Sequence, residues 1–187
     1  MPRNPKSHAD PEHPPGQSRT IVLVGLMGAG KSTVGRRLAV RLGMHFIDAD
    51  EEIERAAGMS IAEMFEKFGE PAFRDGERRV IARIIAGPPC VLATGGGAFV
   101  NAETRALILN EALAIWLDAD VDTLAARVTR RNTRPLLAGK DPRAVLTDLA
   151  AKRNALYAEA QLRVPSASAP HEVTVDAILK ALESCRT

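Results

Sequence analysis

The chain has 187 residues, of which 45% are hydrophobic and 26% charged, a composition typical of one globular domain with a sizeable core. Its formal net charge is +2, which gives no reason to expect nucleic acid or an anionic membrane as a partner. No apolar run approaches the roughly 20 residues of a membrane-spanning helix, and the N-terminus lacks the apolar core of a secretory signal, so we expect a cytoplasmic protein.

Residues 1–19 are predicted to form a disordered, proline-rich tail. They contain five prolines and almost no apolar side chains, so burial cannot offset the entropy lost on ordering. The folded part is expected to begin near Thr20 and to form a single domain over residues 20–187. The two cysteines, Cys90 and Cys185, match no zinc or redox spacing and are expected to be small buried hydrophobes.

From Thr20 onward, short strand-like runs alternate with segments of helical periodicity. In chain order the sequence predicts a strand at 20–25, a helix at 31–42, a strand at 45–49, helices at 60–69 and 71–86, strands at 90–94 and 113–118, a helix from residue 121, a long helix at about 142–160, a strand at 171–175 and a last helix at 176–185. The helix at 60–69 opens with a capping box, Ser60 and Glu63, and Gly69 closes it. Strands alternating with helices indicate an α/β fold with a parallel sheet covered on both faces.

The run GLMGAGKST, residues 25–33, lies between the first strand and the first helix. Its spacing is that of a phosphate-binding loop, in which glycines turn backbone N–H groups toward the phosphates and the helix N-terminus adds its dipole. Lys31 can reach the β- and γ-phosphates, and the Ser32 hydroxyl can ligate Mg²⁺. The loop therefore predicts ATP or GTP binding, by Gly28, Ala29, Gly30, Lys31, Ser32 and Thr33.

Two acids, Asp48 and Asp50, end the second strand, where ligands bind in open α/β sheets. They are two residues apart and lie on the same side of an extended chain, so one can serve a metal while the other faces a substrate hydroxyl. Capping of the next helix explains either acid equally well.

Three further groups of polar residues admit a structural explanation as well as a functional one. Arg74 and Glu77 share a helical face, as a surface ion pair would. The loop at 129–141 concentrates arginines, which solubility alone could explain, although a mobile arginine could close over phosphates. Arg153 and Tyr157 share a helix, where a solvated charge beside a partly buried ring is the plainer interpretation.

Taken together, these segments resemble one family. GLMGAGKST, FIDADEEIE, SIAEMFEKFGEPAFRDGE, ATGGGA, NTRPLL and KRNALY occur in the order and spacing of the shikimate kinases, over about residues 20–180. The resemblance implies a P-loop kinase fold with a five-stranded parallel sheet of order 2-3-1-4-5, a substrate-binding region at about 48–78 and a mobile lid at about 129–141. It implies transfer of the γ-phosphoryl group of ATP to the 3-hydroxyl of shikimate, a step toward chorismate and the aromatic amino acids.

The same resemblance assigns roles on the nucleotide side. The implied catalytic residues are Asp50, Lys31 and Arg134, with Asp50 as base or orienting group for the attacking hydroxyl and Arg134 closing over the phosphates from the lid. Arg127 is expected at the nucleotide. Mg²⁺ is the expected cofactor, held by Ser32 and, through water, by Asp48.

On the acceptor side, the resemblance implies a shikimate site. Its residues would be Asp50, Arg74, Gly95, Gly96, Gly97 and Arg153. Arg74 and Arg153 would grip the carboxylate, which a planar guanidinium suits better than an ammonium group, and Glu77 would hold Arg74 in position. Phe65 and Phe73 would pack against the ring of the substrate. Having no β-carbon, the three glycines could let the backbone approach a small polyol closely.

Two alternatives stay open at this point. A gluconate-type or nucleoside monophosphate kinase shares the fold and differs in acceptor, although the glycine run and the arginines favour a small carboxylated acceptor. A non-catalytic, nucleotide-dependent switch is the second alternative; the chain has no NKxD guanine-reading motif, which weakens a GTPase. ATP and shikimate are the expected partners, of a protein that we expect to be a monomer.

Overall fold

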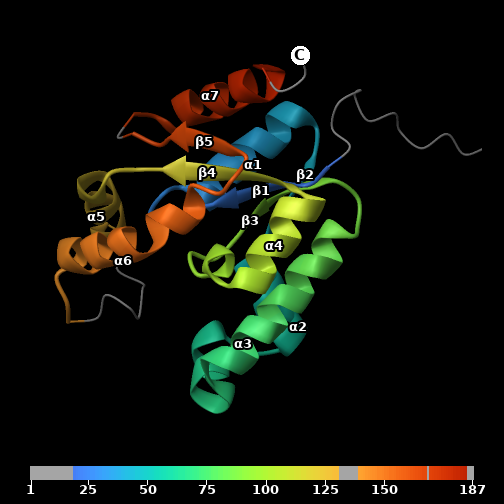
Figure 1. The fold of residues 1–187 in the computed structure, drawn as a ribbon, viewed down its shortest axis with the longest axis vertical. Helices are drawn as coiled ribbons and strands as arrows, with labels where there is room; N and C mark the ends of the chain where they lie inside the picture. Colours follow the sequence, from blue (N-terminus) through green and yellow to red (C-terminus); the bar gives the residue numbers. More distant parts are fainter. Residues whose placement is uncertain (1–18, 131–138, 168, 185–187) are drawn as a thin grey trace, which may run out of the picture.

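A single parallel sheet organises the structure, a computed structural model that describes residues 19–130, 139–167 and 169–184 (Figure 1). Its strands are β1 (Ile21–Val24), β2 (His45–Asp48), β3 (Cys90–Ala93), β4 (Leu113–Asp118) and β5 (Leu162–Pro165). The order is β2-β3-β1-β4-β5, and every neighbouring pair is parallel. β1 and β3 are buried along their whole length, as apolar strands covered on both faces must be. The order implied by the resemblance is confirmed.

Helices cover both faces of this sheet. They are α1 (Lys31–Leu42), α2 (Ala49–Ala57), α3 (Ile61–Ile85), α4 (Ala102–Glu111), α5 (Val121–Thr129), α6 (Pro142–Tyr157) and α7 (His171–Ser184), with a short 3₁₀ turn η1 (Ala98–Val100). α1 and α7 pack together on one face, and α4 and α6 lie on the other (Figure 1). α2 and α4 were not predicted from the sequence, and α6 ends at Tyr157 rather than near residue 160.

The break predicted at Gly69 is present inside α3. Gly69 has φ 77° and ψ 171°, so two helical segments meet there at a kink. The predicted capping box is also formed, because Glu63 N–H donates to Ser60 Oγ at 3.2 Å and Ser60 N–H donates to the Glu63 carboxylate at 2.8 Å. The first segment of α3, together with α2, extends away from the sheet (Figure 1).

The predicted fifth strand at 171–175 is wrong. Those residues form the first turns of α7, where Thr174, Val175 and Ile178 are buried at helical spacing while Val173 is exposed. The β-branched run suggested a strand, but packing against α1 decided otherwise. The true β5 is an edge strand with only Val164 fully buried, and its arginine and proline hid it from a search for apolar runs.

Several predictions concern segments at or beyond the limits of the described residues. Cys90 is buried as a free thiol, as expected, while Cys185 lies outside the described residues. The predicted tail, except Arg19, and the central part of the predicted lid also lie outside them. Among the helices that are described, none is both long and apolar enough to cross a membrane.

Candidate active site

The phosphate-binding loop joins β1, the central strand, to α1. Gly25, Gly28 and Gly30 have φ values of 138°, 83° and 92°, a region that glycine adopts without strain. α1 begins at Lys31, so the N–H groups of its first turn and the positive end of its dipole face the loop. The Lys31 ammonium group donates to the carbonyl oxygens of Gly25 and Leu26 at 2.8 and 2.9 Å. The loop thus has the backbone geometry that phosphate binding needs.

Asp48 caps α2 and also contacts the start of α1. Its Oδ1 accepts from the Asp50 N–H at 3.1 Å and so caps α2, while its Oδ2 accepts from Ser32 Oγ at 2.7 Å. The hydrogen bond to Ser32 joins the end of β2 to the start of α1, which brings a hydroxyl and a carboxylate together beside the phosphate-binding loop. Hydroxyl and carboxylate oxygens are ligands that suit Mg²⁺.

Two cavities meet this edge of the sheet. One, of about 190 Å³, has Gly28, Lys31, Ser32, Asp48, Asp50 and Arg127 in its wall. The other, of about 510 Å³, is lined by Arg74, Gly97 and Arg153 among others. Gly95 and Gly96 line the first cavity and Gly97 the second, so the glycine run connects them.

Close approach of side chains, and not backbone strain, explains Gly95 and Gly97. None of them has a positive φ. A β-carbon on Gly95 would lie 2.9 Å from Asp50 Oδ1, and one on Gly97 would lie 2.7 Å from Arg74 Cζ. At Gly96 the nearest atoms would be Met27 N at 3.5 Å and Gly25 O at 3.7 Å. The loop therefore lies against the phosphate-binding loop and leaves room for an acid and an arginine beside it.

Arg74 is held by two carboxylates. Its Nη1 donates to Glu77 at 2.6 Å, and its Nη2 and Nε face Glu70 at 3.3 and 3.4 Å. Glu77 is 1% exposed, and burial raises the pKa of its carboxyl group although the charge of Arg74 opposes this. The guanidinium group also lies 5.1 Å from the ring centre of Phe73, which contacts Phe65. This arrangement fixes one edge of Arg74 and leaves the other edge with a weaker, exposed partner.

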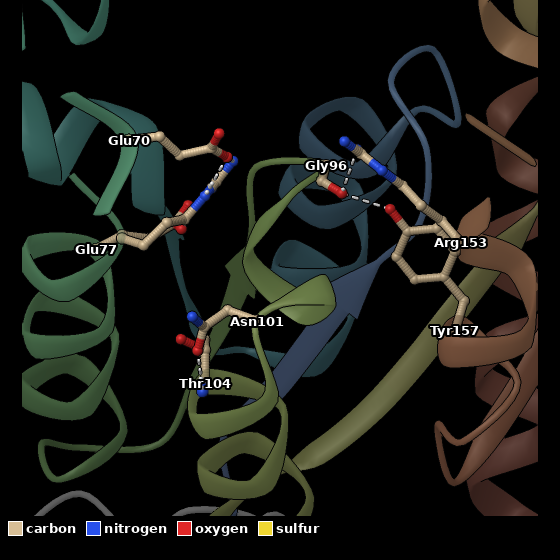
Figure 2. Close-up of polar contacts among 8 residues, drawn as sticks. Glu70, Glu77, Gly96, Asn101, Thr104, Arg153 and Tyr157 are labelled. Carbon is tan, nitrogen blue, oxygen red and sulfur yellow. Dashed lines mark hydrogen bonds and ion pairs between the residues drawn. The ribbon is translucent and has the colours of Figure 1, made fainter. Parts of the chain in front are cut away.

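Arg153 reaches the same loop from α6. Its Nη1 donates to the Gly96 carbonyl oxygen at 3.1 Å, and the Tyr157 hydroxyl donates to the same oxygen (Figure 2). Figure 2 shows Glu70 and Glu77 on the opposite side of the loop from Arg153 and Tyr157. The two arginines therefore approach the glycine run from different helices.

Arg127 ties the phosphate-binding loop to the end of β5. Its Nη1 donates to Gly28 O at 3.2 Å and to Ser166 Oγ at 3.1 Å. Ser166 is 1% exposed and donates in turn to Ala29 O at 2.9 Å. The hydrogen bond from Ser166 therefore fixes the Ala29 carbonyl group. Thr33, which was also predicted to bind the nucleotide, lies in the first turn of α1.

Comparison with known proteins decides the family. The family model for shikimate kinase matches residues 27–183. A shikimate kinase of Caulobacter vibrioides is 64% identical over 90% of this chain and 84% of its own, and one of Zymomonas mobilis is 59% identical over 88% of this chain and 93% of its own. The chain belongs to the shikimate kinase family.

Solved structures agree with this assignment to the shikimate kinase family. A shikimate kinase from Acinetobacter baumannii in complex with shikimate superposes with a TM-score of 0.85 at 38% identity, covering 90% of this chain and 95% of that one. A gluconokinase from Sinorhizobium meliloti has a TM-score of 0.62 at 18% identity, which shows a shared fold alone.

Of the residues that the shikimate kinase resemblance singles out, nearly all converge in the structure. Asp48, Asp50, Arg74, Arg127, Arg153 and the glycine run meet at one end of the sheet, whereas Arg134 lies outside the described residues. Ser166, Tyr157 and His171 were not predicted at the site. His171 lies against the phosphate-binding loop, its ring 3.3 Å from where a β-carbon of Gly30 would be. None of the motifs that carry the resemblance covers Ser166 or His171.

Proposed function

We propose that the protein transfers the γ-phosphoryl group of ATP to the 3-hydroxyl of shikimate, giving shikimate 3-phosphate and ADP. Membership of the shikimate kinase family supports the activity. The observation that carries the assignment of residues is the pair of guanidinium groups, Arg74 and Arg153, that lines one cavity next to the glycine run. A planar guanidinium binds a carboxylate with two parallel hydrogen bonds, and shikimate carries one carboxylate.

On the acceptor side, we assign carboxylate binding to Arg74 and Arg153. The buried Glu77 fixes the Nη1 edge of Arg74, so the Nη2 and Nε edge is the one available to a ligand. Glu70 faces that edge at 3.3 to 3.4 Å with a side chain 64% exposed, so an incoming carboxylate can replace it at little cost. The backbone of residues 95–97 would then lie along the substrate hydroxyls.

On the donor side, we assign the phosphates to the phosphate-binding loop. Lys31 would exchange its two carbonyl acceptors for phosphate oxygens, which are stronger acceptors for an ammonium group because they carry charge. Arg127 lines the same cavity, and we place it beside the nucleotide. We assign Arg134, in the lid, to the charge that develops on the transferring group.

Asp50 would act on the attacking hydroxyl. It lies in the wall of the cavity of about 190 Å³ that the phosphate-binding loop lines, and beside Gly95, so it is placed where the two substrates would meet. The 3-oxygen forms a bond to the γ-phosphorus as the bond to the β–γ bridging oxygen breaks, and the carboxylate of Asp50 orients the hydroxyl and accepts its proton. Closure around the substrates would exclude water, which otherwise competes for the phosphoryl group.

Mg²⁺ fits the residues at the donor site. The family is generally magnesium-dependent, and the ion would neutralise phosphate charge when bound. Among the described residues, no three His, Cys, Asp or Glu side chains converge to hold a metal ion by themselves. Mg²⁺ usually binds through few protein ligands beside nucleotide phosphates, so Ser32 and, through water, Asp48 suffice.

We propose that the protein acts as a monomer. We place the protein in the cytoplasm, where ATP is available as the phosphoryl donor.

An assay of ADP release with alternative acceptors tests the proposed function. Purified protein with ATP and Mg²⁺ is offered shikimate, gluconate or AMP, and we expect turnover with shikimate to exceed that with either other acceptor by orders of magnitude. Gluconate is the informative comparison because it also carries a carboxylate. Turnover with gluconate or AMP and none with shikimate would refute the proposal, and ADP release independent of any acceptor would favour a nucleotide switch.

A further inference from the structure

The Gly96 carbonyl oxygen is the point at which α6 holds the glycine run. It accepts hydrogen bonds from Arg153 Nη1 at 3.1 Å and from the Tyr157 hydroxyl (Figure 2). Arg153 is half-buried, and we assign its guanidinium group to the substrate carboxylate, so this group would contact both the loop and the ligand. The second donor, Tyr157, is not assigned to a substrate.

Tyr157 is built as a fixed donor. It is 0% exposed, and its ring stacks with those of Phe99 and Trp116, at centroid distances of 6.3 and 6.1 Å. Burial raises the pKa of its phenol group, so the hydroxyl keeps its proton through the neutral range. A buried aromatic side chain packed against two other rings can hold a peptide group in one orientation.

Peptide geometry connects this hydrogen bond to the acceptor cavity. In a planar trans peptide the C=O and N–H point in opposite directions, and the chain contains no cis peptide bond among its described residues. Because the Gly96 C=O points toward α6, the Gly97 N–H points away from it, toward the side on which Glu70 and Glu77 lie in Figure 2. On that side Gly97 lines the cavity that also contains Arg74 and Arg153, which we call the acceptor cavity.

The N–H groups of Gly96 and Gly97 are available to a ligand. Within the part of the chain that the structure describes, neither donates a hydrogen bond to another protein group. Glycine also lacks the side chain that would restrict its torsion angles, so the loop needs an external contact to keep a peptide oriented. Tyr157 supplies this contact from 61 residues away in the sequence.

We propose that Tyr157 is a positioning residue for the acceptor: its hydroxyl holds the Gly96–Gly97 peptide so that the Gly97 N–H faces the bound substrate beside Arg74. This proposal rests on the proposed function. In this proposal Tyr157 acts on the acceptor through the glycine run, although the Arg153 guanidinium also lies beside its hydroxyl. Its effect is therefore on acceptor affinity and not on the nucleotide or on the chemical step.

Tyr157→Phe removes only the hydroxyl and leaves the ring stack in place. We expect KM and Kd for shikimate to rise about tenfold, which is the loss of one hydrogen bond, while KM for ATP stays within about twofold and kcat changes little. Unchanged shikimate affinity, or equal rises in both KM values, would overturn the proposal. If the wild-type protein fails to turn over shikimate, the proposed function fails instead, and the variant is not needed to show it.

Two further measurements distinguish an effect of Tyr157 through the glycine run from an effect through Arg153 or through packing. Phe99→Leu perturbs the same ring stack without removing the hydroxyl, so it should lower the melting temperature and leave KM for shikimate near that of the wild type. The carboxamide analogue of shikimate removes the charge that Arg153 would bind. A tenfold penalty from Tyr157→Phe that persists with the analogue supports action through the glycine run. A penalty that disappears would mean that Tyr157 acts through Arg153, and a rise in shikimate KM in Phe99→Leu equal to that in Tyr157→Phe would mean a packing effect; either result overturns the proposal.

Discussion

Gly97→Ala is the substitution that most sharply separates the acceptor site from the rest of the molecule. The backbone at Gly97 has φ −98° and ψ −14°, which alanine adopts without strain. The added β-carbon, however, would lie 2.7 Å from Arg74 Cζ, with Nη2 closer still, so the guanidinium group must move by about 1 Å before Nη2 reaches an ordinary contact of about 3.4 Å.

The displaced guanidinium has little freedom. Its Nη1 is bound to the buried Glu77 at 2.6 Å, so movement away from Gly97 strains a charge-assisted hydrogen bond. Misplacement of a binding group by about 1 Å commonly costs about 100-fold. For a shift of this size we expect KM for shikimate to rise about 10- to 100-fold, or about 1.4 to 2.8 kcal/mol, with KM for ATP unchanged.

Initial-rate kinetics with each substrate varied in turn measures this effect. Gly76→Ala is the matched control, because no atom lies within 4 Å of its β-carbon position and it stands on the same helix as Arg74. It should leave both KM values unchanged and raise the melting temperature slightly. Gly96→Ala, whose β-carbon makes only ordinary contacts, should have a smaller effect than Gly97→Ala. A Gly97→Ala protein with wild-type KM for shikimate would refute the packing argument.

Three more predictions follow from the same contacts. Asp50→Asn should lower kcat by about 10²- to 10⁴-fold while the Kd for ATP, measured by calorimetry, changes little; near-normal turnover would remove Asp50 from its assigned role. Glu70→Gln should lower KM for shikimate by up to about threefold, because it removes an exposed competitor for Arg74 whose ion pair is weak, and a large rise would show that Glu70 holds Arg74 instead. Because the folded-state pKa of Glu77 is raised above its ordinary 4.5, Glu77 takes up a proton as the pH falls through that raised value, and Arg74 then loses its anionic partner. KM for shikimate should therefore rise toward acid pH in the wild-type protein and show less of this dependence in Glu77→Gln; identical pH profiles of the two proteins would contradict the assignment.

The parts of the site that the sequence predicted are those whose chemistry constrains adjacent residues. The phosphate-binding loop needs glycines, a lysine and a hydroxyl at fixed spacing, so its residues can be named from nine letters. The break at Gly69 and the capping box at Ser60 are equally local. The prediction of a strand at 171–175 was wrong because these residues have strand-like composition. Their helical structure depends on packing against α1, which the local sequence does not show.

The residues that the sequence did not indicate act across long separations. Ser166, a small residue in a segment without a clear motif, meets Ala29 from 137 residues away and also accepts a hydrogen bond from Arg127. Tyr157 looked like an ordinary core residue, which it also is. Its contact with Gly96 becomes visible only when α6 is placed beside the glycine run. The glycines themselves were expected to make room for a substrate, and they also make room for Asp50 and Arg74.

The most direct test of the account is the position of the transferred phosphate. Protein, ATP, Mg²⁺ and shikimate are incubated, and the product is examined by phosphorus–proton correlation NMR. We expect a single phosphate ester on the 3-hydroxyl, because Asp50 and the carboxylate-binding arginines would fix which oxygen faces the nucleotide. Esters on other hydroxyls, or release of inorganic phosphate without an ester, would contradict it.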